Sequence, residues 1–314
     1  MSAITDTAER RHDPYPSRLP EERWLPRQDQ TVWSQWCPDA PLTAQQTDHF
    51  DRDGFIVLRD LFSKEEVKAL MQESVALRGG ERELEEGSVI TEPGSDEVRT
   101  IFKLPEQSPL FNRLASDRRV ADTASYLLGD EVYIHQSRLN YKPGFTGKEF
   151  YWHSDFETWH AEDGMPRMRA VSAALLLTDN DALNGPLMLM PGSHNHFIAC
   201  AGETPEDNYK SSLKKQEAGT PSHEALAKLA KEHGIHAATA KAGTLVLFDC
   251  NTMHGSNGNI TPFARSNAFF VFNAVSNQLE EPFGAKKPRP EFLGFRGEPK
   301  PVEIASGKLA SDSA

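Results

Sequence analysis

The sequence predicts a mainly β fold with flanking α-helices, built on a double-stranded β-helix core of the jelly-roll or cupin type. Three observations predict this fold class. Short β-prone runs alternate with turn signals from about residue 132 to 276. The runs are evenly spaced, which is typical of two sheets that close into a barrel. The clear helical signals lie mostly outside that stretch, as expected for flanking helices.

Two helices are predicted ahead of the core, because a Ser or Thr is followed three residues later by Glu or Gln, the spacing of a capping box. The pairs are Thr43 with Gln46 and Ser63 with Glu66. A strand over 55–62 is expected between these helices. Residues 81–98 are acidic and contain glycine, so they predict a loop. Another helical stretch is predicted over 108–128, ending at Gly129.

The core itself is predicted from six β-prone segments. They are VYIHQSRLNYK (132–142), EFYWHSDFETW (149–159), AVSAALLLTD (170–179), PLMLMPGS (186–193), GTLVLFDC (243–250) and NAFFVFNAV (267–275). One helix interrupts them, with Ser222 as its cap and Gly234 at its end. The predicted catalytic domain therefore covers residues 41–298.

The two ends of the chain differ from the domain in composition. Residues 1–40 are rich in Pro, Arg, Asp and Gln and predict an extended N-terminal arm. A mobile tail and an arm that covers the domain are equally compatible with that composition. Residues 299–314 are polar and predict a flexible tail.

Composition narrows the class of protein. The chain has 314 residues and a formal net charge of -12, which makes nucleic acid and anionic membranes improbable partners. Its three cysteines form no CxxC spacing, so we expect no disulfide framework. The N-terminus has no apolar signal segment, and no apolar run is long enough to span a membrane. These features predict a cytoplasmic protein.

The central motif is His153-Ser154-Asp155. In a strand, residues i and i+2 point to the same face, so one strand could present both ligands to a metal ion. The pair alone is a weak signal, because chance often produces it. A third ligand, His254, follows the β-prone run 243–250 about a hundred residues later. Two histidines and one carboxylate form a facial triad that holds iron(II) and leaves room for a 2-oxo acid and dioxygen.

Arg265 and Ser256 supply the companion site. Arg265 lies eleven residues after His254, about one strand and one turn further along. A guanidinium there can form a bidentate pair with the distal carboxylate of 2-oxoglutarate. Ser256 can add a hydroxyl donor to the same carboxylate. A surface ion pair is the alternative for Arg265, but the β-prone run directly after it favours a buried position.

The sequence contains other histidines and several phenylalanines near these motifs. His135, His160, His194 and His196 are predicted to be packed, hydrogen-bonded or exposed rather than metal ligands. Three phenylalanines are predicted to shield the reactive centre, although each could equally be ordinary core. They are Phe102, Phe248 and Phe270.

Several motifs resemble the phytanoyl-CoA dioxygenase superfamily and, within it, the family of ectoine hydroxylases. The general resemblance lies in DHFDRDGFIVLRDLFSKEEV (48–67), NGPLMLMPGSH (184–194) and the arrangement of His254, Ser256 and Arg265. The segment FYWHSDFETWHAEDGMPRMRA (150–170) is the most specific for ectoine hydroxylases. The resemblance covers about residues 40–295 and departs from the family at no metal-ligand position.

The resemblance implies hydroxylation of ectoine to 5-hydroxyectoine by a homodimer. It assigns iron(II) to His153, Asp155 and His254. It implies that 2-oxoglutarate contacts Phe150, Ser256, Arg265 and Asn140. It implies that the ectoine pocket is lined by Gln136, Thr158, Trp159 and Arg289.

The residue types suit that substrate. Trp159 can offer its ring face to the amidinium of ectoine, and Arg289 can pair with the carboxylate from a Pro-rich segment that folds as a lid. Core packing for Trp159 and an exposed loop position for Arg289 are the alternatives. For the whole chain, the alternatives are the same chemistry on another small substrate, such as an amino acid, and a non-catalytic cupin-like binding protein. A zinc hydrolase is disfavoured because no general base stands beside the ligands.

Overall fold

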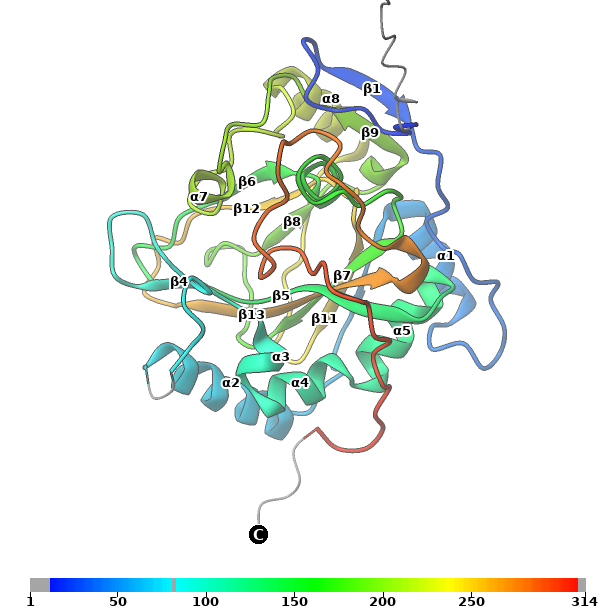
Figure 1. Cartoon of the computed structure of the whole chain (residues 1–314). Coiled ribbons are helices and arrows are strands. Elements are labelled where there is room, and N and C mark those ends of the chain that lie inside the picture. Colours follow the sequence, from blue (N-terminus) through cyan, green and yellow to red (C-terminus); the bar gives the residue numbers. More distant parts are fainter. Residues whose placement is uncertain (1–11, 81–82, 310–314) are drawn as a thin grey trace, which may run out of the picture.

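The computed structural model describes residues 12–80 and 83–309, in which two β-sheets face each other and helices cover the outer face of the larger sheet (Figure 1). The larger sheet has seven strands in the order β2-β11-β7-β13-β5-β4-β3, and the smaller has four in the order β10-β8-β12-β6. All strand pairs in both sheets are antiparallel. The predicted mainly β fold with flanking helices is confirmed.

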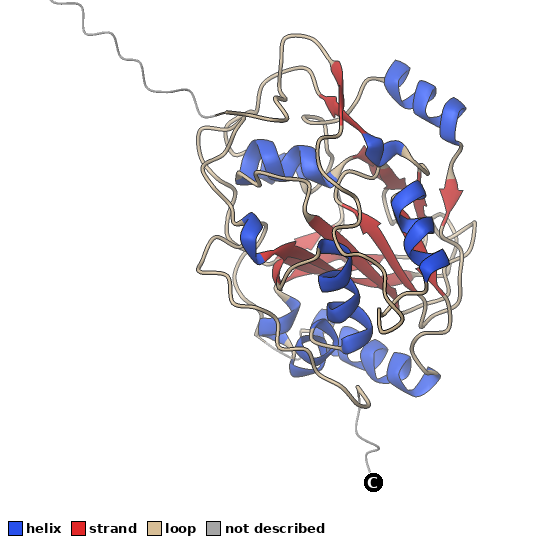
Figure 2. Cartoon of the chain, turned by 90° about the vertical axis from the view of Figure 1, so that its right-hand side faces the viewer, coloured by secondary structure: helices blue, strands red, loops and turns tan. Residues whose placement is uncertain are grey.

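The described residues form thirteen strands. They are β1 (Arg23–Pro26), β2 (Phe55–Leu58), β3 (Val89–Thr91), β4 (Val98–Phe102), β5 (Val132–Lys142), β6 (Phe150–His153), β7 (Ala170–Leu176), β8 (Leu187–Leu189), β9 (His196–Ala199), β10 (His236–Ala237), β11 (Leu245–Asp249), β12 (His254–Ser256) and β13 (Arg265–Ala274). Figure 2 shows the same strands from the side, between surrounding helices and loops.

The helices lie mainly before the core and in one late insertion. They are α1 (Ala44–Asp53), α2 (Lys64–Arg78), α3 (Leu104–Gln107), α4 (Pro109–Ala115), α5 (Arg118–Leu128), α6 (Asp155–Thr158), α7 (Tyr209–Ser212) and α8 (His223–His233). Three further helices among the described residues are the π-helix η1 (Trp159–Asp163) and the 3-10 helices η2 (Ser193–Asn195) and η3 (Val275–Asn277). Both predicted capping boxes form, at Thr43 and at Ser63.

Alternation along the buried strands separates two cores. Along β13, Ala268 and Phe270 pack into the core beneath the helices, whereas Phe269 packs between the two sheets. Leu187 and Leu189 of the smaller sheet meet Phe269 in that second core. Because successive side chains in a strand point to opposite faces, a sheet covered on both sides must be apolar at nearly every position. The second core fills part of the space between the sheets, and its members Leu187 and Phe269 also line a cavity.

Two predicted elements differ from the structure. The expected loop over 81–98 contains β3, and β4 begins at its end, because β4 pairs with β5, β3 pairs with β4, and the Arg99–Glu92 ion pair is buried beside them. The low β-propensity of the acidic residues was outweighed by pairing with β5, a strand that is distant in sequence. The expected single helix over 108–128 is two helices, because Asp117 caps α5 and breaks the run.

The N-terminal arm covers the domain over its described part, residues 12–40. Strand β1 pairs with β9, and the Tyr15 side chain is fully buried. Arg18 forms an ion pair with Glu157, and Arg27 forms one with Asp249. Residues 12–40 therefore cover the domain, which is one of the two alternatives predicted for the arm. Residues 1–11 lie outside the described part.

The expected flexible tail also makes contacts in its described part. The amide of Val302 donates to the carbonyl of Val132, and the amide of Ala305 donates to that of Ser116, both over 2.8 Å. Leu309 is buried against the helical layer. Residues 302–309 thus lie along the domain, whereas 310–314 are outside the described residues.

Candidate active site

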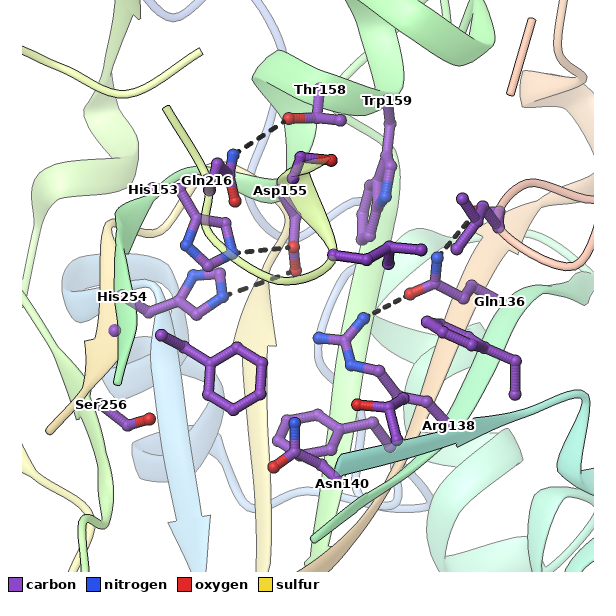
Figure 3. A pocket seen from close by; sticks show the side chains of 18 of the residues that line it. Gln136, Arg138, Asn140, His153, Asp155, Thr158, Trp159, Gln216, His254 and Ser256 are labelled. Carbon is purple, nitrogen blue, oxygen red and sulfur yellow. Dashed lines mark hydrogen bonds and ion pairs between the residues drawn. The ribbon is translucent and has the colours of Figure 1, made fainter. Parts of the chain in front are cut away.

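The three predicted metal ligands meet in the wall of the cavity that Leu187 and Phe269 line. His153 ends β6 and His254 begins β12, and these residues are register partners with ring centroids 4.3 Å apart. Asp155 reaches between them, with Oδ1 3.6 Å from Nε2 of His153 and Oδ2 3.8 Å from Nε2 of His254. One ligand atom from each residue lies within 4.8 Å of the others, a spacing that one metal ion could fill (Figure 3).

The predicted reason for the His153 and Asp155 pairing was wrong. Strand β6 ends at His153, and Asp155 is the first residue of helix α6. Ser154 is the N-cap residue, and the acidic residues that follow it favour the first turn of a helix. The carboxylate therefore approaches from a strand-to-helix turn rather than from the same strand face. The spacing still brings the two ligands together.

Backbone carbonyls fix the orientation of both histidine rings. Nδ1 of His153 lies 2.6 Å from the carbonyl oxygen of Tyr151, and Nδ1 of His254 lies 2.9 Å from that of Thr252. With a proton on Nδ1, each ring points the lone pair of Nε2 towards Asp155. Burial lowers the pKa of His254 to about 4, with His153 adding to the effect. His254 is consequently neutral near pH 7, the state in which imidazole binds a metal.

Asp155 is held as a carboxylate. Burial by itself would raise its pKa, but His254, His153 and Arg138 together bring the pKa well below the ordinary value for Asp. The Ser172 hydroxyl donates to Oδ2 over 3.3 Å. The Asp155 carboxylate and the two imidazoles form a donor set of two nitrogens and one oxygen, which suits iron(II).

Strand β5 supplies the facing wall. Gln136, Arg138 and Asn140 occupy alternate positions and all line the cavity that contains the triad (Figure 3). Lys142 is the next member of this series and is fully buried. Arg138 and Lys142 were not predicted as site residues. The signal was available, because four polar residues at a spacing of two in an otherwise β-prone run indicate one polar face.

The far end of the cavity is cationic. Arg265 is 2% exposed, and its Nη2 donates to Oδ1 of Asn140 over 2.8 Å. Burial lowers the pKa of Arg265 to about 10, with nearby Arg99 adding to it, so the guanidinium stays charged at neutral pH. Among the described residues, Nε of Arg265 has no hydrogen-bond partner. A buried charged donor with an unused hydrogen is suited to an incoming anion.

Lys142 and Ser256 complete that end. Lys142 Nζ donates to Oγ of Ser256 over 2.8 Å and also to the carbonyl oxygen of Asn257. Burial, together with Arg265 and Arg99, lowers the pKa of Lys142 to about 6. Phe150 also lines the cavity, with its ring centroid 3.7 Å from the guanidinium carbon of Arg99. The four residues expected to contact 2-oxoglutarate therefore lie in the cavity wall, beside a lysine that sequence reasoning missed.

The four predicted substrate residues line the same cavity. Trp159 is 2% exposed and begins η1, directly after Thr158 of α6. Gln136 Nε2 donates to the carbonyl oxygen of Leu293 over 2.7 Å. Arg289 reaches the cavity from the segment after the core and forms an ion pair with Asp163. The structure thus brings Trp159 and Arg289 to one pocket, although they are 130 residues apart.

The remaining histidines have other partners. His160 contacts the carbonyl oxygen of Met165 and the carboxylate of Asp13, and His135 packs against Trp159 with ring centroids 5.2 Å apart. Within residues 12–80 and 83–309, the triad is the one cluster of this kind able to hold a metal ion. His194 contacts the carbonyl oxygen of Asp51, and His196 is exposed.

Two of the three expected shielding residues lie near the triad. Phe102 lines the cavity, and the Phe248 ring centroid lies 4.8 Å from that of His254. Phe270 was wrongly predicted, because it points to the opposite face of β13 and packs beneath the helices. Its neighbour Phe269 lines the cavity instead.

A jelly-roll core with two histidines and one aspartate arranged in this way defines the class of mononuclear non-haem iron oxygenases. Comparison with known proteins gives the family. The chain belongs to the phytanoyl-CoA dioxygenase family, whose model matches residues 50–267.

Within that family, the chain is similar to ectoine dioxygenases. It is 59% identical over 298 residues to the ectoine dioxygenase of Sphingopyxis alaskensis, covering 95% of this chain and 97% of the relative. It is 54% identical over 284 residues to the ectoine dioxygenase of Halomonas elongata, covering 90% of this chain and 85% of the relative.

Solved structures agree with this grouping. The crystal structure of EctD from S. alaskensis with 2-oxoglutarate and 5-hydroxyectoine has a TM-score of 0.88 and 55% identity, covering 95% of this chain and 100% of that chain. EctD from the same organism with bound Fe has a TM-score of 0.87 and 54% identity, with the same coverage. The carbocyclase SnoK from nogalamycin biosynthesis shares the fold at 18% identity and a TM-score of 0.60, covering 87% of this chain and 98% of SnoK.

Proposed function

We propose that this chain hydroxylates ectoine to 5-hydroxyectoine with iron(II), 2-oxoglutarate and dioxygen, releasing succinate and carbon dioxide. The observation that carries the proposal is a single cavity lined by the triad, by Arg265 with its unused Nε, and by Trp159 and Arg289. The high identity to ectoine dioxygenases over nearly the whole chain supports the substrate.

His153, Asp155 and His254 would hold the iron. Three protein ligands leave positions for other molecules, which a closed four-ligand structural site does not. Bound iron(II), with its co-substrates, supplies the oxidising power that amino-acid side chains lack. The protein's part is to keep both imidazoles correctly turned, to keep His254 neutral, and to hold Asp155 as an anion.

The cationic end would bind the distal carboxylate of 2-oxoglutarate. Arg265 offers a free Nε–H, and the ammonium form of Lys142 and the hydroxyl of Ser256 lie beside it. Asn140 holds the guanidinium through Nη2. The Phe150 ring would pack against the aliphatic part of the molecule. Because this end is buried, each charged hydrogen bond is stronger than it would be in water.

Ectoine is a small zwitterion with a delocalised amidinium and a carboxylate. The Trp159 ring is suited to the cation, and Arg289 is suited to the carboxylate. Gln136 and Thr158 offer polar atoms between them. Phe102, Phe248 and Phe269 restrict water around the triad, which protects the protein from side reactions.

The remaining expectations extend this proposal. We propose a homodimer, because three exposed apolar side chains, Phe145, Ile260 and Phe263, lie on two loops joined by a bond from the Phe145 amide to the Thr261 carbonyl. Sedimentation velocity of the wild type and of Phe263→Asp tests the homodimer.

We also propose a role in osmostress metabolism in the cytoplasm, where the three free thiols and iron(II) would stay reduced. No helix among the described residues is long and apolar enough to cross a membrane.

One reconstitution experiment tests the function. Purified protein is incubated with iron(II), ascorbate, 2-oxoglutarate and ectoine, and products are followed by mass spectrometry and succinate assay. We expect a product heavier than ectoine by one oxygen atom, formed in step with succinate. Asp155→Ala is expected to lose iron and both products, whereas Asp179→Ala, which removes an exposed aspartate outside the cavity, is the matched control. Turnover undiminished in Asp155→Ala would refute the triad.

The two alternatives give different results. An enzyme that acts on another small substrate would consume 2-oxoglutarate with a member of an amino-acid and acyl-CoA panel but not with ectoine. A non-catalytic cupin-like protein would bind metal without substrate-dependent oxygen uptake. Arg265 and Ser256 at the co-substrate end argue against the second alternative, since a simple metal binder has no use for a co-substrate anchor.

A further inference from the structure

Arg289 does not reach the cavity as a free side chain. Its Nε donates to Oδ1 of Asp163 over 2.8 Å and its Nη2 donates to Oδ2 over 2.5 Å. A second bond runs from Nη2 to the carbonyl oxygen of Leu293 over 3.3 Å. The hydrogen bonds seen for this side chain among the described residues start from Nε and Nη2. The bidentate contact thus fixes the guanidinium plane and leaves one nitrogen for a ligand.

Asp163 connects Trp159 and Arg289, the two residues assigned to the substrate end of the pocket. It is the last residue of η1, the π-helical turn that Trp159 begins, and it is 1% exposed. Such turns are frequent at functional sites. The Asp163 carboxylate therefore links the helix that carries Trp159 to the segment that carries Arg289. Asp163 itself does not line the cavity, whereas Trp159 and Arg289 do.

The segment after β13 is also built around Asp163. Its backbone carbonyl accepts from Nη1 of Arg296 over 2.6 Å. Gly294 passes so close that a Cβ there would lie 2.8 Å from the Asp163 carboxyl carbon. The Arg296 guanidinium reaches on to the carbonyl oxygen of Glu280 over 2.8 Å. These contacts anchor residues 280–296 on one buried acidic residue.

The electrostatics require this partner. Burial would raise the pKa of Asp163, but Arg289 and then His135 bring it below its ordinary value, so the pair is ionic. A buried guanidinium that loses its carboxylate must turn towards water or leave the pocket. Removal of the Asp163 charge should therefore displace Arg289 rather than merely weaken a surface contact.

We propose that Asp163 is a positioning residue for substrate binding, which holds Arg289 with Nη1 towards the cavity and so sets the affinity for the substrate carboxylate. The proposal rests on the proposed function, because it takes ectoine as the ligand of Arg289. Asp163 acts through Arg289 and does not itself touch the substrate.

The test compares Asp163→Asn with Asp249→Asn. Asp249 forms an equally buried bidentate pair with Arg27, at 2.7 and 2.8 Å, and does not line the cavity. For Asp163→Asn we expect the ectoine KM and the calorimetric Kd to rise at least about tenfold, with kcat and the 2-oxoglutarate KM changed by less than about threefold. Asp249→Asn is expected to lower the melting temperature without a selective effect on ectoine.

Two further variants show whether the effect passes through Arg289. If it does, Asp163→Asn combined with Arg289→Gln binds ectoine no more weakly than Arg289→Gln alone. Gly294→Ala keeps every charge but presses a methyl group on the Asp163 carboxylate, so it should raise the ectoine KM in the same direction even if Asp163→Asn folds poorly.

The proposal is overturned if Asp163→Asn and Gly294→Ala leave the ectoine KM unchanged, if they raise the KM of ectoine and 2-oxoglutarate equally, or if the loss persists in full on the Arg289→Gln background. Failure of the proposed function is a separate result: the wild type itself would then form no ectoine-dependent product.

Discussion

Arg265 donates from Nη2 to Oδ1 of Asn140 over 2.8 Å, while its Nε has no hydrogen-bond partner among the described residues. Arg265 begins β13 and Asn140 lies on the neighbouring β5. The sheet thus holds a buried guanidinium in one orientation and leaves part of it unsatisfied. Because an unpaired buried donor is costly, the folded protein is poised for an anion at this position.

Arg265→Gln is expected to raise the KM for 2-oxoglutarate by about 100-fold or more, since it removes a charge and at least two charged hydrogen bonds to the ligand. Succinate formation at varied 2-oxoglutarate measures this effect. Arg265→Lys keeps the charge but not the planar pair of donors, and it should recover only part of the affinity. An unchanged 2-oxoglutarate KM in both variants would show that the co-substrate binds elsewhere.

Lys142 gives a prediction about pH. Its pKa is lowered to about 6 by burial and by Arg265 and Arg99, so it is mostly neutral in the free protein at neutral or slightly alkaline pH. A bound dicarboxylate favours the ammonium form and raises this pKa. Binding of 2-oxoglutarate should therefore take up a proton, and its affinity should fall as the pH rises above about 6.

The uptake is measured by calorimetry of the anaerobic iron(II) protein in two buffers with different ionisation enthalpies. We expect up to about one proton per 2-oxoglutarate in the wild type and a clear decrease in Lys142→Met. Lys103→Met, which removes a partly exposed lysine that pairs with Glu85 outside the cavity, is the matched control. Binding heats that do not depend on the buffer would contradict the prediction.

The sequence predicted the elements whose signals are local. Capping boxes at Thr43 and Ser63 and the alternation of β5 and β13 depend on neighbouring residues, and these elements formed as expected. The triad was predicted from His153, Asp155 and His254 together with Arg265 and Ser256, because the pair of His153 and Asp155 alone is a weak signal. Strands β3 and β4 were missed because β4 is stabilised by pairing with β5, and β3 by pairing with β4, which no local pattern reveals.

Site residues were missed where function depends on tertiary contacts. Lys142 and Arg138 continue the polar face of β5, so closer attention to its period would have found them. Asp163 had no such signal, because its importance arises only when the segment carrying Arg289 folds back over η1. Phe270 was predicted to shield the centre, but Phe269 lines the cavity instead. Composition alone does not say which face of β13 points to the cavity.

Trp159 provides a test of the substrate end. Trp159→Ala should raise the ectoine KM about 2- to 30-fold through loss of the cation–π contact, whereas Trp159→Phe keeps an aromatic face and should lose less. Both variants should leave the KM for 2-oxoglutarate near the wild-type value, since that ligand is assigned to the Arg265 end. If Trp159→Ala binds ectoine as tightly as the wild type, Trp159 is an ordinary core residue and not a substrate contact.

Tyr15 tests whether the N-terminal arm stabilises the domain. Its ring is fully buried and packs edge-on against Phe156 and Phe197, with centroids 5.2 and 5.4 Å away, and its hydroxyl donates to Asp29 over 2.8 Å. Tyr15→Ala should reduce the free energy of unfolding by about 3–5 kcal/mol, because it leaves a cavity in an aromatic cluster.

Tyr15→Phe separates packing from the hydrogen bond and should cost about 1 kcal/mol. Leu183→Ala, at a 71% exposed position, should change the free energy by less than about 0.5 kcal/mol. Urea unfolding of the four proteins measures these differences. Phe156 lies in α6, just before Thr158 and Trp159, so Tyr15→Ala should also weaken ectoine binding more than 2-oxoglutarate binding. Wild-type stability in Tyr15→Ala would mean that the arm covers the domain without stabilising it.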